Sequence, residues 1–120
     1  MVKAVFDTNV LIDFLTGRAE ARDEIARFES PSISIVTWME VMVGATEAAA
    51  DDTRAWLSTF EVIGLDPPVA EVAVALRRRH RLKLPDAIVW ASARTRGALL
   101  VTRDQRGFPQ DDPGVRVPYA

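Results

Sequence analysis

Ala4-Val5-Phe6-Asp7-Thr8-Asn9 is the stretch that decides the fold of this 120-residue chain. Its apolar residues stop abruptly at an acid, which indicates a short buried strand from Ala4 to Phe6. The residues that follow, Asn9 to Leu15, have helical spacing, and Gly17 ends that helix. A buried strand that passes directly into a helix is typical of an α/β fold.

The rest of the chain repeats this alternation of short apolar segments and amphipathic helices. Further strands are predicted at Ser32–Val36, Val62–Leu65, Ala98–Val101 and Val115–Val117. Further helices are predicted at 21–28, 37–44, 53–60, 69–76 and 85–95. Strands separated by helices pair in parallel, with right-handed crossovers. We therefore predict a single domain, residues 1–120: a three-layer α/β/α sandwich with a four- to five-stranded, mainly parallel sheet.

The composition excludes several classes of site. The sequence has no cysteine and one histidine, His80, which rules out a disulfide scaffold, a thiol nucleophile and a Cys- or His-rich metal site. The net charge of -2 argues against indiscriminate polyanion binding. An acid at position 7 comes too early for a signal peptide, and no apolar run is long enough to span a membrane. We expect a soluble cytoplasmic protein with no membrane association.

Four acids could converge at the edge of the sheet where ligands bind in such folds, because two follow predicted strands and two lie in the first turns of predicted helices. They are Asp7, Glu40, Asp86 and Asp104. Each also has a simpler structural explanation. Asp7 and Asp86 suit the first turn of a helix, Thr37-Trp38-Met39-Glu40 matches a capping box, and Asp104 suits an Asx turn.

Their joint placement points to a metal. Carboxylates a few ångströms apart repel one another, and some would bind protons unless a cation is present. Oxygen-only ligands favour Mg²⁺ or Mn²⁺, which also bind phosphates. Such a centre polarises a phosphoryl oxygen and activates water. The chemistry indicated is hydrolysis of a phosphodiester.

Four segments that carry these acids resemble the motifs of the PIN-domain nucleases. They are residues 5–13, 35–44, 84–91 and 99–104, in the family's order, and the resemblance extends from Val5 to about Tyr119. Order, spacing and length are similar to those of the VapC toxins of bacterial toxin–antitoxin pairs. One departure stands at Gly107, where many relatives have another acid before the phenylalanine that corresponds to Phe108.

The resemblance implies a Mg²⁺- or Mn²⁺-dependent endoribonuclease. Asp7 and Asp86 would be the most direct metal ligands, and Glu40 and Asp104 would bind metal through water, complete a second site or orient the attacking water. The supporting hydrogen bonds would come from Thr8, Asn9 and Thr102. The reaction would be in-line attack by metal-activated water on RNA, leaving a 5′-phosphate. The implied partners are RNA, a VapB-type antitoxin and a second copy in a homodimer. The alternative is a catalytically silent PIN-like module that binds RNA or a protein.

Arg103 and Arg106 stand beside Asp104. They suit contacts with substrate phosphates and, equally, salt bridges to the acidic cluster. Outside the cluster, the basic run Arg77 to Arg81 suits contacts with RNA phosphates but is more typical of a solvated helix end, which is what we expect. Asp13 lies two turns from Asp7 and could be functional, but we expect it on the surface.

Overall fold

The computed structural model describes residues 2–120, and within that range the chain forms a five-stranded sheet. All strand pairs are parallel, and the order across the sheet is β3-β2-β1-β4-β5. The strands are β1 (Ala4–Phe6), β2 (Ser32–Ser34), β3 (Glu61–Ile63), β4 (Leu99–Val101) and β5 (Val115–Arg116). The predicted parallel α/β sandwich is confirmed.

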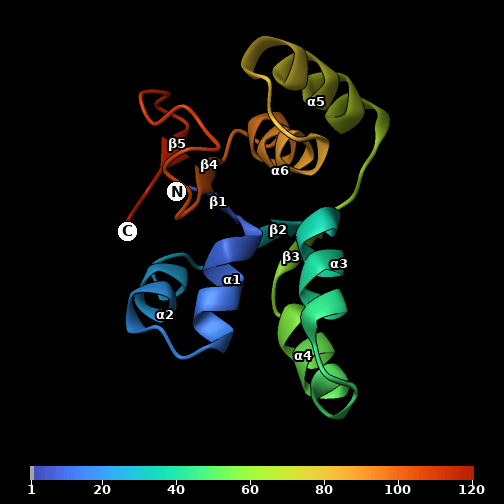
Figure 1. Cartoon of the computed structure of the whole chain (residues 1–120), viewed down its shortest axis with the longest axis vertical. Coiled ribbons are helices and arrows are strands. Elements are labelled where there is room, and N and C mark those ends of the chain that lie inside the picture. The colour runs from blue at the N-terminus through green and yellow to red at the C-terminus, as the bar shows by residue number, and fades with distance from the viewer. Residues whose placement is uncertain (1) are drawn as a thin grey trace.

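Helices cover both faces of the sheet. On one face lie α5 (Pro67–His80) and α6 (Leu84–Thr95). On the other lie α1 (Thr8–Leu15), α2 (Ala19–Ala26), α3 (Ile35–Gly44), the 3₁₀ turn η1 (Glu47–Ala49) and α4 (Ala50–Leu57), as Figure 1 shows. No helix within residues 2–120 is both long enough and apolar enough to cross a membrane.

Side chains of the central strands alternate between the two helical layers. Val5 and Leu100 pack with α5 and α6, whereas Phe6, Ile33 and Val101 pack with the helices on the other face. All five side chains are fully buried. Burial on both faces explains why β1 and β4 are continuous apolar runs, whereas β2 alternates between serine and isoleucine.

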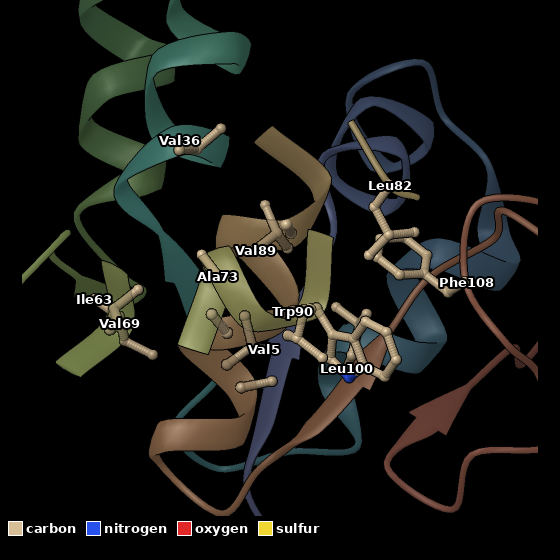
Figure 2. Packing of buried hydrophobic residues seen from close by; sticks show 14 of the residues in the cluster. Val5, Val36, Ile63, Val69, Ala73, Leu82, Val89, Trp90, Leu100 and Phe108 are labelled. Carbon is tan, nitrogen blue, oxygen red and sulfur yellow. The ribbon is translucent and has the colours of Figure 1, made fainter. Parts of the chain in front are cut away.

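Two buried anchors fix the loops at one end of the sheet. Trp90 on α6 meets Phe108 edge to face, with ring centroids 5.9 Å apart. Leu82, from the α5–α6 loop, belongs to the same cluster (Figure 2). Because Leu82 and Phe108 are both buried, the α5–α6 loop and the loop after β4 are each anchored to the core.

Helix α3 begins at Ile35, earlier than the predicted start at Thr37. Ser34 is its cap, because the Ser34 hydroxyl accepts a hydrogen bond from the Val36 amide at 3.1 Å. The capping box with Thr37 as cap and Glu40 as its partner is therefore wrong. Thr37 lies inside the helix, fully buried, and the Glu40 carboxylate is available for other contacts.

The parallel register brings two strand ends together. Phe6 on β1 is paired with Val101 on β4, and the Asp7 amide donates to the Val101 carbonyl at 2.9 Å. The residues that immediately follow these strands, Asp7 and Thr102, therefore lie side by side at the carboxyl edge of the sheet. This is the edge where the sequence places its acids.

Candidate functional site

Asp7 occupies the end of β1 and caps α1, and its side chain is nearly buried, with 6% of the residue exposed. One carboxylate oxygen accepts from the Thr8 amide at 2.8 Å. The other accepts from the Thr102 hydroxyl at 2.9 Å and from the Asn9 side-chain amide at 3.2 Å. All three donors are neutral, and they are the residues predicted to support the site. Asp7 therefore caps α1 and also belongs to the acidic cluster.

Burial raises the pKa of Asp7 from 3.8 to about 6. The hydrogen bonds from Thr102 and Thr8 act in the opposite direction, and the charges of Asp86 and Glu40 raise the pKa further. Without a nearby cation, Asp7 therefore stays protonated to a higher pH than an ordinary aspartate does. A cation close by would remove the cause of the shift, because it would compensate the buried charge.

Glu40 reaches the same network from α3. Its carboxylate accepts a hydrogen bond from the Thr8 hydroxyl at 2.7 Å, and the Thr37 hydroxyl lies 3.1 Å from the same Thr8 oxygen. Thr37 is a site residue that the sequence reasoning assigned to a helix cap. Its only sequence signal is its position one helical turn before Glu40, on the same face of α3.

Asp86 lies in the first turn of α6, as predicted, and is half-buried. Burial raises the pKa of Asp86, and the nearby charges of Asp104 and Glu40 raise it further, while Lys83 lowers it. Asp86 also acts on the pKa of Asp7. Asp86 thus interacts unfavourably with all three other acids, and Asp7 does so with Asp86 and Glu40.

Asp104 organises the loop after β4. One of its carboxylate oxygens accepts from the amides of Arg106 and Gly107, both at 2.9 Å, which confirms the Asx-type turn. Its own amide donates to the Thr102 hydroxyl oxygen at 3.0 Å. Thr102 therefore connects Asp104 to Asp7. Hydrogen bonds run without a break from Glu40 through Thr8, Asp7 and Thr102 to Asp104.

Gly107 has a structural reason in this chain. A Cβ atom at position 107 would lie 2.2 Å from the second carboxylate oxygen of Asp104. The side chain of Asp104 folds back into the space that a residue larger than glycine would need. An acid at this position, as in many resembling proteins, would require the Asp104 carboxylate to move.

The Arg103 guanidinium pairs with Asp13 rather than with the acidic cluster, although the Arg103 side chain stays 36% exposed. Its guanidinium makes two contacts with the Asp13 carboxylate, at 2.5 and 3.3 Å, and its amide donates to the Asn9 side chain at 3.1 Å. Asp13 also accepts from the Tyr119 hydroxyl at 2.9 Å, and only 8% of the residue is exposed. The expectation that Asp13 lies on the surface is wrong. The hydrogen bond to Asp13 raises the pKa of Arg103, and the positive charge of Arg103 is paired with Asp13 in the folded protein.

Arg106 remains beside the acids. It lines a pocket of about 300 Å³ together with Asp86 and Asp104, and the pocket also contains His80, Arg81 and Lys83. A second hollow, formed by Asn9 and the loop 103–106, adjoins it. The acids thus lie next to open, polar space that is bordered by cations.

The donor set suits a hard divalent cation, although residues 2–120 contain no group of three or more acids or histidines already arranged to hold one. Asp104 is turned toward its own loop amides, and Glu40 toward Thr8. Carboxylates are the ligands that Mg²⁺ and Mn²⁺ prefer. Burial and the neighbouring acids raise the pKa of Asp7 and of Asp86, and a divalent cation held by these carboxylates would favour their ionised forms. The residues therefore fit such an ion.

Comparisons with known proteins identify the family and agree with the fold. The family model described as "PIN domain" matches residues 4–111. A chain of a toxin–antitoxin complex from Klebsiella pneumoniae is 45% identical, with a TM-score of 0.92 and 98% of each chain covered. A chain of DNA-bound VapBC from Salmonella typhimurium is 26% identical, with a TM-score of 0.77, over 97% of this chain and 96% of that one.

A more distant structure, VapBC-5 from Mycobacterium tuberculosis, shares the fold at 22% identity, with a TM-score of 0.65 and 97% of each chain covered. Among curated proteins, no match was found.

Proposed function

The chain belongs to the PIN-domain family, and from this premise we propose that it is a metal-dependent endoribonuclease and the toxin of a VapBC-type toxin–antitoxin pair. The observation that carries the proposal is the meeting of four acids, Asp7, Glu40, Asp86 and Asp104, at one edge of the sheet. Two of them have raised pKa values because they are partly or wholly withdrawn from water and face one another. Carboxyl groups whose pKa is raised by burial and by neighbouring charges are typical of catalytic sites.

Asp7 and Asp86 would hold Mg²⁺ or Mn²⁺, and Glu40 and Asp104 would complete the centre. When bound, the ion supplies Lewis acidity toward a phosphoryl oxygen and lowers the pKa of water. The chain's own groups then have separate tasks. Thr102 and the Thr8 amide fix the orientation of the Asp7 carboxylate.

In this proposal Glu40 would orient an attacking water and accept its proton. The Thr8 hydroxyl holds one of its oxygens, which fixes the direction of the carboxylate. Asp104 is held at the other end of the network by its own loop. The pocket beside Asp86 and Asp104 gives an RNA phosphodiester room to approach. RNA in the cytoplasm is thus the proposed substrate.

Cleavage of a labelled RNA with Mg²⁺, Mn²⁺ or EDTA tests the enzymatic part. We expect cleavage that EDTA abolishes and that Asp7→Asn and Asp86→Asn each reduce at least about 100-fold, the scale of losing a group that stabilises the transition state. Asp52→Asn, an exposed acid on α4, is the matched control and should cleave normally. Cleavage that persists in both site variants would overturn the mechanism. RNA binding without cleavage by the wild-type protein would favour the silent module.

The antitoxin partner is proposed from the complexes in which the similar structures occur and from an apolar groove. The groove, of about 330 Å³, lies between α1 and the α3–α4 segment and includes Ile12, Leu15 and Val41. Ile12 and Leu15 are 38% and 45% exposed and line the same groove, and neighbouring exposed apolar side chains of this kind are typical of a binding surface. An apolar segment of the antitoxin would fill this groove. The proposed homodimer would be tested by sedimentation equilibrium.

Co-expression with the antitoxin gene tests the partner. Wild-type toxin should arrest growth, and the antitoxin should relieve the arrest. Leu15→Asp should abolish co-purification and relief while cleavage by the isolated toxin persists. Leu65→Asp, an equally exposed apolar residue outside the groove, is the control. If Leu15→Asp co-purifies with the antitoxin as well as the control does, the groove is not the binding surface.

A further inference from the structure

Arg81 is the single non-glycine residue with a positive φ among residues 2–120. It ends α5 with φ 56° and ψ 36°, the left-handed conformation that disfavours residues with a Cβ. The chain uses glycine for the same task elsewhere: Gly17 (φ 88°) follows α1, and Gly97 (φ 61°) follows α6. An arginine at this helix end is thus an exception within the molecule itself.

The backbone has a clear reason to turn at residue 81. The next residue, Leu82, is buried in the cluster of Trp90 and Phe108, as Figure 2 shows, so the chain must reverse direction at the end of α5. That reversal explains the left-handed conformation but not the arginine, since glycine adopts it without strain. The reason for the arginine has to lie in its side chain.

Arg81 is one of the residues that line the pocket containing Asp86 and Asp104, and it is exposed. Lys83 lies on the same rim, and Arg106 reaches it from the loop after β4. Leu82 and Phe108 anchor these two loops to the core, so the cations are held near the acids by rigid neighbours.

Within the described residues, neither Arg81, Lys83 nor Arg106 forms a salt bridge, in contrast to Arg103 with Asp13 and Arg116 with Glu24. A cationic rim beside a cluster of acids suits a polyanion that must approach that cluster. Arginine is favoured for phosphate because its guanidinium makes two parallel hydrogen bonds.

We propose that Arg81 binds a backbone phosphate of the RNA next to the cleaved bond and positions the strand over the four acids. This rests on the proposed function of the same site. Arg81 then acts through binding and orientation, and Lys83 and Arg106 extend the same phosphate track on either side. The unfavourable backbone conformation is retained because the site needs a cation there.

Arg81→Gly tests the proposal, because glycine suits the backbone while removing the cation. We expect RNA affinity, measured by fluorescence anisotropy with a labelled single-stranded RNA, and kcat/KM to fall about 10-fold, the size of one charge-assisted contact. The slope of log affinity against log salt should shrink by about 1. The unfolding temperature should stay the same or rise. Arg81→Lys should recover part of the lost affinity.

Arg79→Ala is the matched control, since it removes an exposed arginine from the same helix end but outside the pocket. Its affinity and salt slope should equal those of the wild type. If Arg81→Gly retains wild-type affinity, kcat/KM and salt slope, or changes them no more than Arg79→Ala does, the proposal for Arg81 is overturned while the ribonuclease stands. If the wild-type protein neither binds nor cleaves RNA, both proposals fall.

Discussion

Asp7 and Asp13 are two nearly buried acids on the same short stretch of chain, with exposed fractions of 6% and 8%. Asp13 faces cations: Arg103 binds it directly, Arg18 lies 3.8 Å from it, and Tyr119 donates a hydrogen bond. Asp7 accepts hydrogen bonds from neutral donors and is surrounded by other acids. Burial of a carboxylate therefore does not identify a functional site by itself; the charge of its neighbours does.

The two regions are joined by one residue. Arg103 binds Asp13 through its side chain and Asn9 through its amide, while Asn9 donates to Asp7. The compensated acid thus supports the loop that carries Asp104. The ion pair of Arg103 with Asp13 therefore lies beside Asp7, whose own hydrogen-bond donors are neutral.

Of the substitutions at these two buried acids, Asp7→Asn should change the free energy of unfolding most. The folded-state pKa of about 6 exceeds the ordinary 3.8, so the folded protein binds the proton more tightly and ionised Asp7 destabilises it above pH 6. Asparagine removes that penalty. We expect the metal-free variant to be more stable than the wild type by up to about 3 kcal/mol at pH 7.5. The difference should vanish below about pH 4, where Asp7 is protonated in both states.

Urea unfolding in EDTA at several pH values checks this prediction. Adding Mg²⁺ should narrow the gap, because the ion stabilises the wild type and not the variant. A variant that is less stable than the wild type at pH 7.5 would contradict the assignment of Asp7 as an uncompensated buried charge.

Asp13→Asn should change stability in the opposite direction and destabilise the protein. It leaves Arg103 without its anionic partner, and we expect a loss of about 2 kcal/mol, toward the lower range for such pairs because the Arg103 side chain is 36% exposed. Urea unfolding at pH 7.5 measures the change. The exposed pair of Asp51 with Arg54 provides the control, since Asp51→Asn should cost below about 0.5 kcal/mol. Equal losses of stability in Asp13→Asn and Asp51→Asn would show that the buried ion pair contributes no more than the exposed one.

Thr102→Val removes the hydroxyl that joins Asp7 to Asp104. Thr102 is fully buried, so the loss leaves the Asp104 amide without its acceptor and should cost about 1 to 2 kcal/mol. The pKa of Asp7 should rise further, because the Thr102 hydrogen bond now lowers it. Carboxyl ¹³C NMR titration and unfolding together test both effects. Thr95→Val, near the end of α6, should leave the Asp7 titration unchanged.

Gly107→Ala should have the smallest effect on stability, below about 1 kcal/mol, since the Asp104 side chain can rotate away from the new methyl group. Cleavage should fall several-fold because Asp104 leaves its held position. Gly64→Ala meets no atom within 4 Å and serves as the control. Unchanged cleavage in Gly107→Ala would show that the position of Asp104 does not matter to the reaction.

Local sequence patterns made the positions of the four acids at the sheet edge predictable. Asp7 ends an apolar run, Asp104 follows the run ending at Val101, and parallel strands place their carboxyl ends at one edge. The pairing of Asp13 with Arg103 was not predictable, because 90 residues separate the partners. A lone acid in an apolar helix looks the same in sequence whether or not a distant arginine covers it.

The same limit applies to Glu24, which binds Arg116 across 92 residues at 2.6 Å. The wrong prediction of a capping box at Thr37 has a related cause. Ser34 and Thr37 are both good cap residues, and only the position at which β2 ends decides between them.

The sequence by itself determined the parallel α/β sandwich, the acids at its edge and the absence of cysteine ligands, because these follow from hydrophobic spacing and composition. Only the tertiary structure decided which charges are compensated. It paired Arg103 with Asp13 rather than with the acidic cluster, placed Arg81 on the rim of the pocket, and left Asp7 among other acids. The physical reason is that the energy of a charge depends on what lies within a few ångströms of it, and chain order does not fix those neighbours.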